Sequence, residues 1–157
     1  MKLSKLFGLC LICGWLAACT SISASTEIPV VRVSDITILP EENGRSDFEV
    51  TLLVSNPNAE AIELSSIDYS IRLAGEGFVE GVITAPGTLA PASDTRVRGR
   101  VSSEFVSSIS RLVAYLQGAE STLPYELEGT LYRATRPPRP MRFSGSGRTP
   151  LIMSAGR

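Results

Sequence analysis

The sequence contains no histidine, and its two lysines, Lys2 and Lys5, both lie at the extreme N-terminus. Without histidine, the chain lacks the usual general base, the most common metal ligand and the side chain that titrates near neutral pH. No lysine is left in the rest of the chain to activate a serine nucleophile in its place. We therefore expect no catalytic residues and no enzymatic activity.

Cysteine is also scarce, with three residues at Cys10, Cys13 and Cys19. No Cys/His cluster has zinc-site spacing, and the carboxylates do not follow the spacing of a calcium loop. The sequence therefore predicts no metal site and no cofactor. Beyond residue 18 the chain carries 13 Arg against 16 Asp and Glu, a net charge of −3. This balance argues against a nucleic-acid partner, because neutralising phosphates requires excess cations.

The first nineteen residues have the pattern of an export signal. The two lysines give a positive start, and residues 6–18 are uncharged and mostly apolar. This stretch is too short to span a bilayer, which takes about 20 apolar residues. Its end resembles the lipobox of bacterial lipoproteins, formed here by Leu16, Ala17, Ala18 and Cys19.

The lipobox resemblance implies that residues 1–18 are a signal peptide and that Cys19 carries lipid as the first mature residue. An ordinary signal peptide or an uncleaved anchor is the alternative. Two or three acyl chains, as in this lipoprotein class, hold a protein stably at a membrane. Thr20 in place of Asp indicates, by enteric sorting rules, the outer membrane facing the periplasm rather than the inner membrane. Residues 19–27 form the expected tether, in which eight extended residues reach at most ~28 Å.

From residue 28 the hydrophobic pattern has mostly the period of two that is typical of β-strands. The phase of the alternation changes near Ser34 and Asp35, and a second slip at Ser65 and Ser66 indicates a β-bulge. Turn signals separate the apolar stretches at regular intervals. Residues 28–153 are therefore predicted to form a mainly β domain, a β-sandwich of about seven strands. Residues 154–157 are a short tail.

One late segment, residues 105–116, has a helical period instead. Its apolar residues recur at i, i+1, i+4, i+7, i+8 and i+11, which forms a single stripe along one face. Ser102 or Ser103 can cap its start, and Gly118 can end it. We expect one amphipathic helix here, packed against the sheets.

Several separate pieces of the chain resemble the late embryogenesis abundant type 2 family, also called the water stress and hypersensitive response domain. The most specific is Asn56-Pro57-Asn58, followed by the Tyr69 strand and its turn glycine, Gly75. The remaining pieces are Leu64, Ile67, Asp68, Leu73, Gly81, Leu89, Pro91, Tyr125 to Gly129, and Arg142 to Gly147. The resemblance covers roughly residues 29–153. Ala74 departs from it, since the family often has Asn before the turn glycine.

This resemblance implies a fibronectin-III- or immunoglobulin-like sandwich with a helix, and a non-enzymatic role in desiccation or osmotic stress. We expect protection of the cell envelope through contacts with lipids or unfolding envelope proteins. One alternative is a module that binds an acyl chain or other apolar ligand between sheet and helix, lined by Leu112, Leu116 and Leu127. Another is a partner within an envelope complex.

Two groups of arginines are candidate binding residues. The first alternates along one strand face and could contact anionic lipid headgroups; it comprises Arg96, Arg98 and Arg100. The alternative, which we favour, is a solvated face paired with Glu126 or Glu128. The second group surrounds the proline-rich run at 136–140 and comprises Arg133, Arg136, Arg139 and Arg142. It forms either an anion- or partner-binding edge or, as we favour, an edge protected from strand addition.

Two further features are expected to be structural. Turn chemistry accounts for Asn56-Pro57-Asn58, since Asn and Pro favour turns. Tyr69 and Tyr125 are expected to pack their rings inward and keep their hydroxyls in water.

Overall fold

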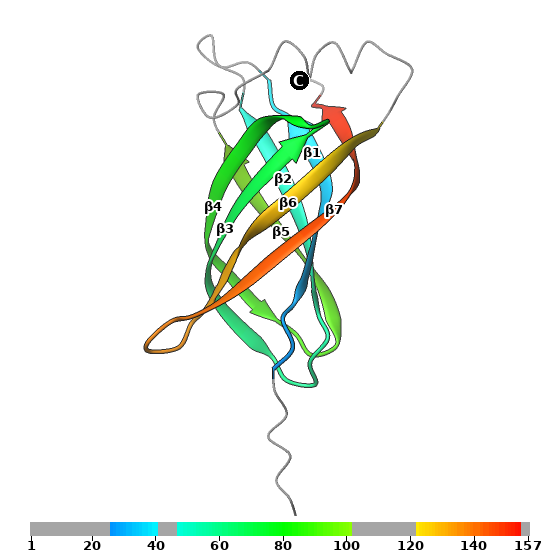
Figure 1. The fold of residues 1–157 in the computed structure, drawn as a ribbon. Coiled ribbons are helices and arrows are strands. Elements are labelled where there is room, and N and C mark those ends of the chain that lie inside the picture. Colours follow the sequence, from blue (N-terminus) through cyan, green and yellow to red (C-terminus); the bar gives the residue numbers. More distant parts are fainter. Residues whose placement is uncertain (1–25, 41–46, 102–121, 155–157) are drawn as a thin grey trace, which may run out of the picture.

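A computed structural model describes residues 26–40, 47–101 and 122–154 (Figure 1). These residues form seven strands: β1 Val30–Ile38, β2 Phe48–Asn56, β3 Ile62–Leu73, β4 Glu76–Leu89, β5 Ser93–Val101, β6 Thr122–Arg133 and β7 Arg139–Met153. The expected mainly β fold of about seven strands is confirmed. The helix predicted at residues 105–116 lies outside the described residues. Within the described ranges, no helix is long and apolar enough to cross a membrane.

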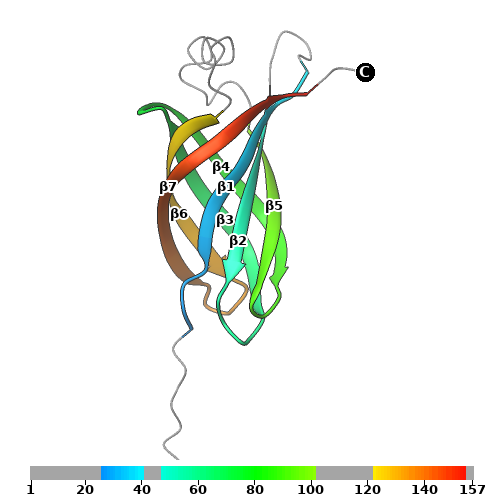
Figure 2. The ribbon, with the colours of Figure 1, turned by 90° about the vertical axis from the view of Figure 1, so that its right-hand side faces the viewer.

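The strands form one sheet in the order β4-β3-β6-β7-β1-β2-β5. Strand β7 pairs antiparallel with β6 from Arg139 to Pro150, and then pairs parallel with β1 from Leu151 to Met153. Because β7 passes from one half of the sheet to the other, the halves are not the two separate layers of the expected sandwich. The sheet instead curls into a nearly closed barrel, as both views show (Figure 2).

Alternation of apolar and polar residues places the core inside this curled sheet. In β2, the inward residues Phe48, Val50, Leu52 and Val54 are at most 1% exposed. The register shifts between Val33 and Asp35 and between Leu64 and Ser66. The first shift confirms the predicted change of phase, and the second confirms the predicted bulge at Ser65 and Ser66. A slip of one residue would otherwise turn the rest of each strand to the wrong face.

Three aromatic side chains lie across glycines on the neighbouring strand. Tyr69 is opposite Gly81, Phe143 is opposite Gly129, and Tyr125 is opposite Gly147. A Cβ on any of these glycines would lie no more than 3.0 Å from the nearest atom of its aromatic partner. Each ring thus covers a bare stretch of backbone, an arrangement that lets a sheet curve strongly.

The strand registers place three turns at the end of the barrel where β1 begins. Val30 pairs with Ser55, Asn56 with Ser93, and Leu64 with Arg133. The turns β2–β3, β4–β5 and β6–β7 therefore share one end with the N-terminal segment (Figures 1 and 2). We call this end the tether pole.

The β3–β4 turn offers a direct test of the departure at Ala74. Ala74 has a φ of 51° and Gly75 a φ of 75°, as in the two-residue turns that favour Asn-Gly. An alanine in this left-handed region costs about 1–2 kcal/mol. We expect Ala74→Asn to raise the free energy of unfolding by about 0.5–1 kcal/mol in urea denaturation. The control Ala59→Asn, at an exposed position whose φ is not positive, should give no gain. An equal effect of both substitutions would contradict the prediction.

Candidate functional site

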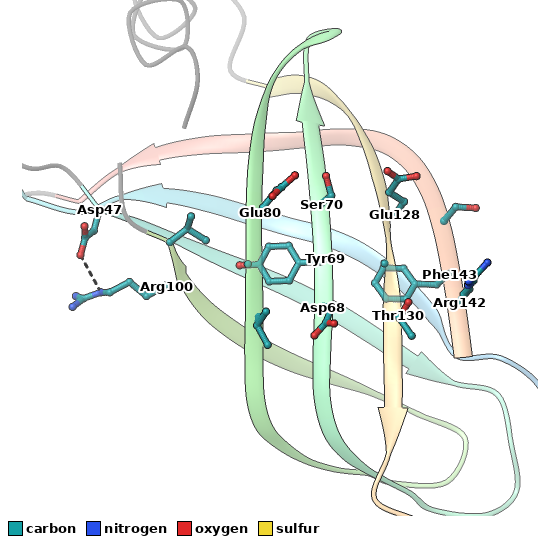
Figure 3. A pocket seen from close by; sticks show the side chains of 15 residues that line it. Asp47, Asp68, Tyr69, Ser70, Glu80, Arg100, Glu128, Thr130, Arg142 and Phe143 are labelled. Carbon is teal, nitrogen blue, oxygen red and sulfur yellow. Dashed lines mark ion pairs between the residues drawn. The ribbon is translucent and has the colours of Figure 1, made fainter. Parts of the chain in front are cut away.

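A hollow of about 1150 Å³ lies along the sheet formed by β4, β3, β6 and β7 (Figure 3). Its charged residues on these strands are Asp68, Glu80, Glu128 and Arg142. They alternate with inward-facing core residues and so project from the outer face of the sheet. Asp47 and Arg100 reach its margin from the other half of the sheet, and their side chains form an ion pair of 3.9 Å. Carboxylates therefore outnumber cations in this hollow.

Register explains why residues distant in the sequence meet here. Ser70 lies between Glu80 on β4 and Glu128 on β6, and Asp68 lies between Val82 and Thr130 in the same way. Residues directly opposite one another in a sheet share a face, so the two rows project together. Sequence reasoning singled out none of these carboxylates for binding. Their alternation within each strand was visible, but the pairing of β3 with both β4 and β6 was not.

Tyr69 lies beneath the hollow and reaches across to the far edge of the sheet. Its ring covers Gly81, and its hydroxyl would lie 2.9 Å from a Cβ placed on Gly99 of β5. The residue is 4% exposed, and its hydroxyl has no hydrogen-bond partner among the described residues. Burial raises the pKa of Tyr69 to about 12, because the charged phenolate is disfavoured away from water.

Tyr125 is buried as well, but its hydroxyl is satisfied. It accepts a hydrogen bond of 3.2 Å from the backbone N–H of Val33, beside the β1 bulge. The expectation that both tyrosine hydroxyls would sit in water is therefore wrong. The curled sheet encloses the rings completely, and the missing side chains of the opposing glycines provide the space.

The side chains around the hollow include several hydrogen-bonding groups. No three His, Cys, Asp or Glu side chains in the described ranges are grouped to hold a metal ion. Carboxylates, Ser70 and Thr130 can accept or donate hydrogen bonds on an exposed face. The hollow thus offers an acidic, hydrogen-bonding surface.

The first arginine group lies on β5, with its side chains exposed. Arg98 approaches Glu49 at 3.8 Å, and Arg100 approaches Asp47 at 3.9 Å. Their carboxylate partners differ from the expected ones because β5 neighbours β2 and not β6. Arg96 stands opposite Leu53. Whether this face contacts lipid headgroups remains a prediction.

The other predicted residues fall into three places. Cys19 and the lipobox residues Leu16, Ala17 and Ala18 lie outside the described residues, as do Leu112 and Leu116. The second arginine group flanks the β6–β7 turn, where residues 139–150 of β7 pair on one side only. Leu127 is 2% exposed and belongs to the core.

The Asn56-Pro57-Asn58 turn holds the tether pole together. The amide of Asn56, 2% exposed, donates to the carbonyls of Glu60 at 2.9 Å and Ala90 at 3.0 Å. Asn58 donates to the carbonyl of Glu27 at 2.9 Å and accepts from its N–H at 2.7 Å. These contacts link three segments of the pole, which supports the structural interpretation of this motif.

Comparisons with known proteins point to one family. The family described as late embryogenesis abundant protein matches residues 51–147. A solution structure from Arabidopsis thaliana is 20% identical with a TM-score of 0.55, covering 84% of this chain and 87% of that one. The solution structure of a protein described as late embryogenesis abundant is 18% identical with a TM-score of 0.50, covering 95% and 85%. These two likenesses concern the fold alone. A comparison with curated proteins finds no match.

The unpartnered hydroxyl of Tyr69 leads to a prediction about alkaline stability. The folded protein keeps Tyr69 neutral until about pH 12, whereas the unfolded chain ionises it near the ordinary pKa of 10.0. Ionisation of Tyr69 therefore does not affect the free energy of unfolding below pH 10.0. As the pH rises from 10.0 to about 12, ionisation in the unfolded chain lowers the free energy of unfolding. Tyr69→Phe should remove this part of the pH dependence. At neutral pH it should leave the free energy of unfolding unchanged or raise it by up to about 1 kcal/mol.

Tyr125→Phe is the matched control, because it removes a hydroxyl that does have a partner. We expect this variant to lose about 1 kcal/mol of stability at neutral pH. Urea denaturation between pH 7 and 12 and the absorbance titration of phenolate measure both effects. Equal losses in the two variants would show that the Tyr69 hydroxyl has a partner after all.

Proposed function

Since this chain belongs to the late embryogenesis abundant type 2 family, we propose that it is a non-enzymatic protein that protects the cell envelope during water loss. The family match over residues 51–147 is the observation that carries this proposal. The hollow supports it, because it combines carboxylates with hydroxyls on an exposed face. Such a surface suits weak contacts with unfolding envelope proteins as water is withdrawn.

The proposed location is the outer membrane, facing the periplasm. The lipobox-like residues that end in Cys19 support it, since acylation there would anchor the chain permanently. The hydrogen bonds between Glu27 and Asn58 then fix the point where the tether meets the barrel. With a reach of at most ~28 Å, the tether would hold the tether pole close to the bilayer.

Binding of an acyl chain is the second candidate, and an envelope-complex partner the third. The burial of Leu127 in the core gives the acyl-chain site no support in the described ranges. Mass spectrometry of the extracted protein would detect a co-purified lipid, and crosslinking in cells would detect a stoichiometric partner. Neither candidate is favoured by a specific contact in the described structure.

Intact-mass analysis and survival of drying test the main proposal together. The protein extracted from membranes should begin at Cys19 and carry the added mass of two or three acyl chains. Cells that lack the gene should survive drying and osmotic shock less well, and the wild-type gene should restore survival. Cys19→Ser should fail to restore it, because the protein would leave the membrane.

Cys13→Ser is the matched control, since it changes a cysteine within the predicted signal peptide. It should leave both acylation and survival intact. A chain that retains Met1 or carries a free thiol at Cys19 would rule out the anchoring. Unchanged survival without the gene would rule out the protective role.

A further inference from the structure

We propose that the β6–β7 turn contacts the anionic headgroups of the membrane in which the chain is anchored. The contact is made by Arg133, Arg136 and Arg139, which we call the arginine turn. It would orient the barrel with the tether pole against the bilayer. This inference rests on the proposed anchoring through Cys19 and adds a second, electrostatic point of attachment.

Position is the first observation. The pairing of Leu64 with Arg133 places the arginine turn at the tether pole, and the N–H of Ala134 donates to the carbonyl of Glu63 at 2.9 Å. The tether meets the barrel at the same pole, where Glu27 is bonded to Asn58. Both figures show the β6–β7 turn and the chain leading into β1 at this end (Figures 1 and 2).

Charge is the second observation. Arg133 and Arg139 stand directly opposite each other across β6 and β7, an arrangement of like charges that destabilises a sheet. Arg136 lies in the exposed turn between them. The sequence contains no Asp or Glu after Glu128, so no carboxylate of this hairpin lies nearer to the turn than Glu128. A layer of anionic headgroups would offset the repulsion between the arginines.

Three other arginines of the sheet each have an acidic side chain nearby. Arg72 pairs with Glu126 at 3.2 Å, and Arg98 and Arg100 each have a carboxylate within 3.9 Å. The arginine turn forms no such ion pair with any described residue. Arg32, Arg96 and Arg142 also have no ion pair with a described residue, so what distinguishes the arginine turn is the gathering of three such cations at one pole.

Apolar exposure at the same pole is the third observation. Ile28 is 52% exposed and Val30 48% exposed, immediately after the tether. Apolar side chains beside arginines are typical of a surface that lies in the interfacial layer of a bilayer. Among the acidic residues of this pole, Glu63 lies next to the arginine turn, since its carbonyl accepts from the N–H of Ala134, but its side chain forms no ion pair with the three arginines in the described structure. Glu60 and Asp94 belong to the β2–β3 turn and the start of β5.

Protection of the free edge of β7 against strand addition explains only some of the prolines and arginines of the β6–β7 hairpin. Pro140 lies in the half of β7 that pairs on one side, where proline prevents strand addition. Arg133, however, lies on β6, which is paired on both sides by β3 and β7. An arginine there protects no edge, and its position opposite Arg139 is accounted for by a shared anionic partner.

A fluorescent reporter on the turn can test this contact in the full-length, membrane-extracted protein. Ala134→Cys places one label beside the arginines, and acylated Cys19 would not react. The protein is reconstituted into vesicles of phosphatidylcholine, alone or with one third phosphatidylglycerol, that carry nitroxide-labelled headgroups. We expect headgroup quenching to be at least twofold stronger on the anionic vesicles and to fall at high salt. A label at Ser154→Cys, at the opposite pole, should show no such increase.

Two triple substitutions on the Ala134→Cys background locate the effect. R133Q/R136Q/R139Q should reduce quenching on anionic vesicles to the level seen on neutral ones. R96Q/R98Q/R100Q removes the same charge from β5 and should leave it unchanged. Unaltered quenching after the first set, or equal loss after both sets, would overturn the proposal. Circular dichroism and thermal unfolding confirm that both variants are folded.

The measurements distinguish a failure of the lipid anchor at Cys19 from a failure of the arginine turn. Binding to neutral vesicles and the intact mass report the lipid anchor, whereas the increase on anionic vesicles reports the arginine turn. An unacylated chain would refute the anchoring. If that chain still bound anionic vesicles through the three arginines, the arginine turn would be supported without the anchor.

Discussion

The three residue pairs that join β1 to β7 hold the two halves of the sheet together. Over its first twelve residues β7 pairs only with β6, and over its last three it pairs only with β1. Away from this junction the halves diverge, and the Tyr125 hydroxyl satisfies the N–H of Val33 in the opening. The transfer of this one long strand joins the two halves into a single curled sheet around the core.

Curling the sheet requires that some strands approach closely, and the glycines opposite aromatic rings allow it. Gly81 and Gly99 leave room for Tyr69, whose side chain passes beneath the hollow toward β5. On the outer surface of the curled sheet, acidic and basic residues lie in different places. Carboxylates gather along the side of the barrel, while the arginine turn projects from the tether pole. A barrel attached at that pole would keep its acidic hollow away from a negatively charged bilayer.

Local patterns predicted the mainly β class and about seven strands, because burial on one face imposes a period of two, but they did not predict the site. The changes of phase marked both register shifts, whereas Gly145, Ser146 and Gly147, which have the composition of a turn, lie within the single strand β7. The expectation that the hydroxyls of Tyr69 and Tyr125 lie in water was wrong, because both rings pack over glycines of neighbouring strands inside the curled sheet. The carboxylates of the hollow were missed for a related reason. Asp68, Glu80 and Glu128 lie on three strands, and only their register brings them together.

The sequence by itself determined the β content, the absence of histidine chemistry, the unbalanced charge after Glu128 and the family resemblance. Each of these is a property of composition or of neighbouring residues along the chain. Only the tertiary structure decided which strands are neighbours. It therefore decided that Arg98 meets Glu49 rather than Glu126, and that the arginine turn shares a pole with the tether. Strand pairing between distant segments is set by the packing of the whole core, which no local pattern contains.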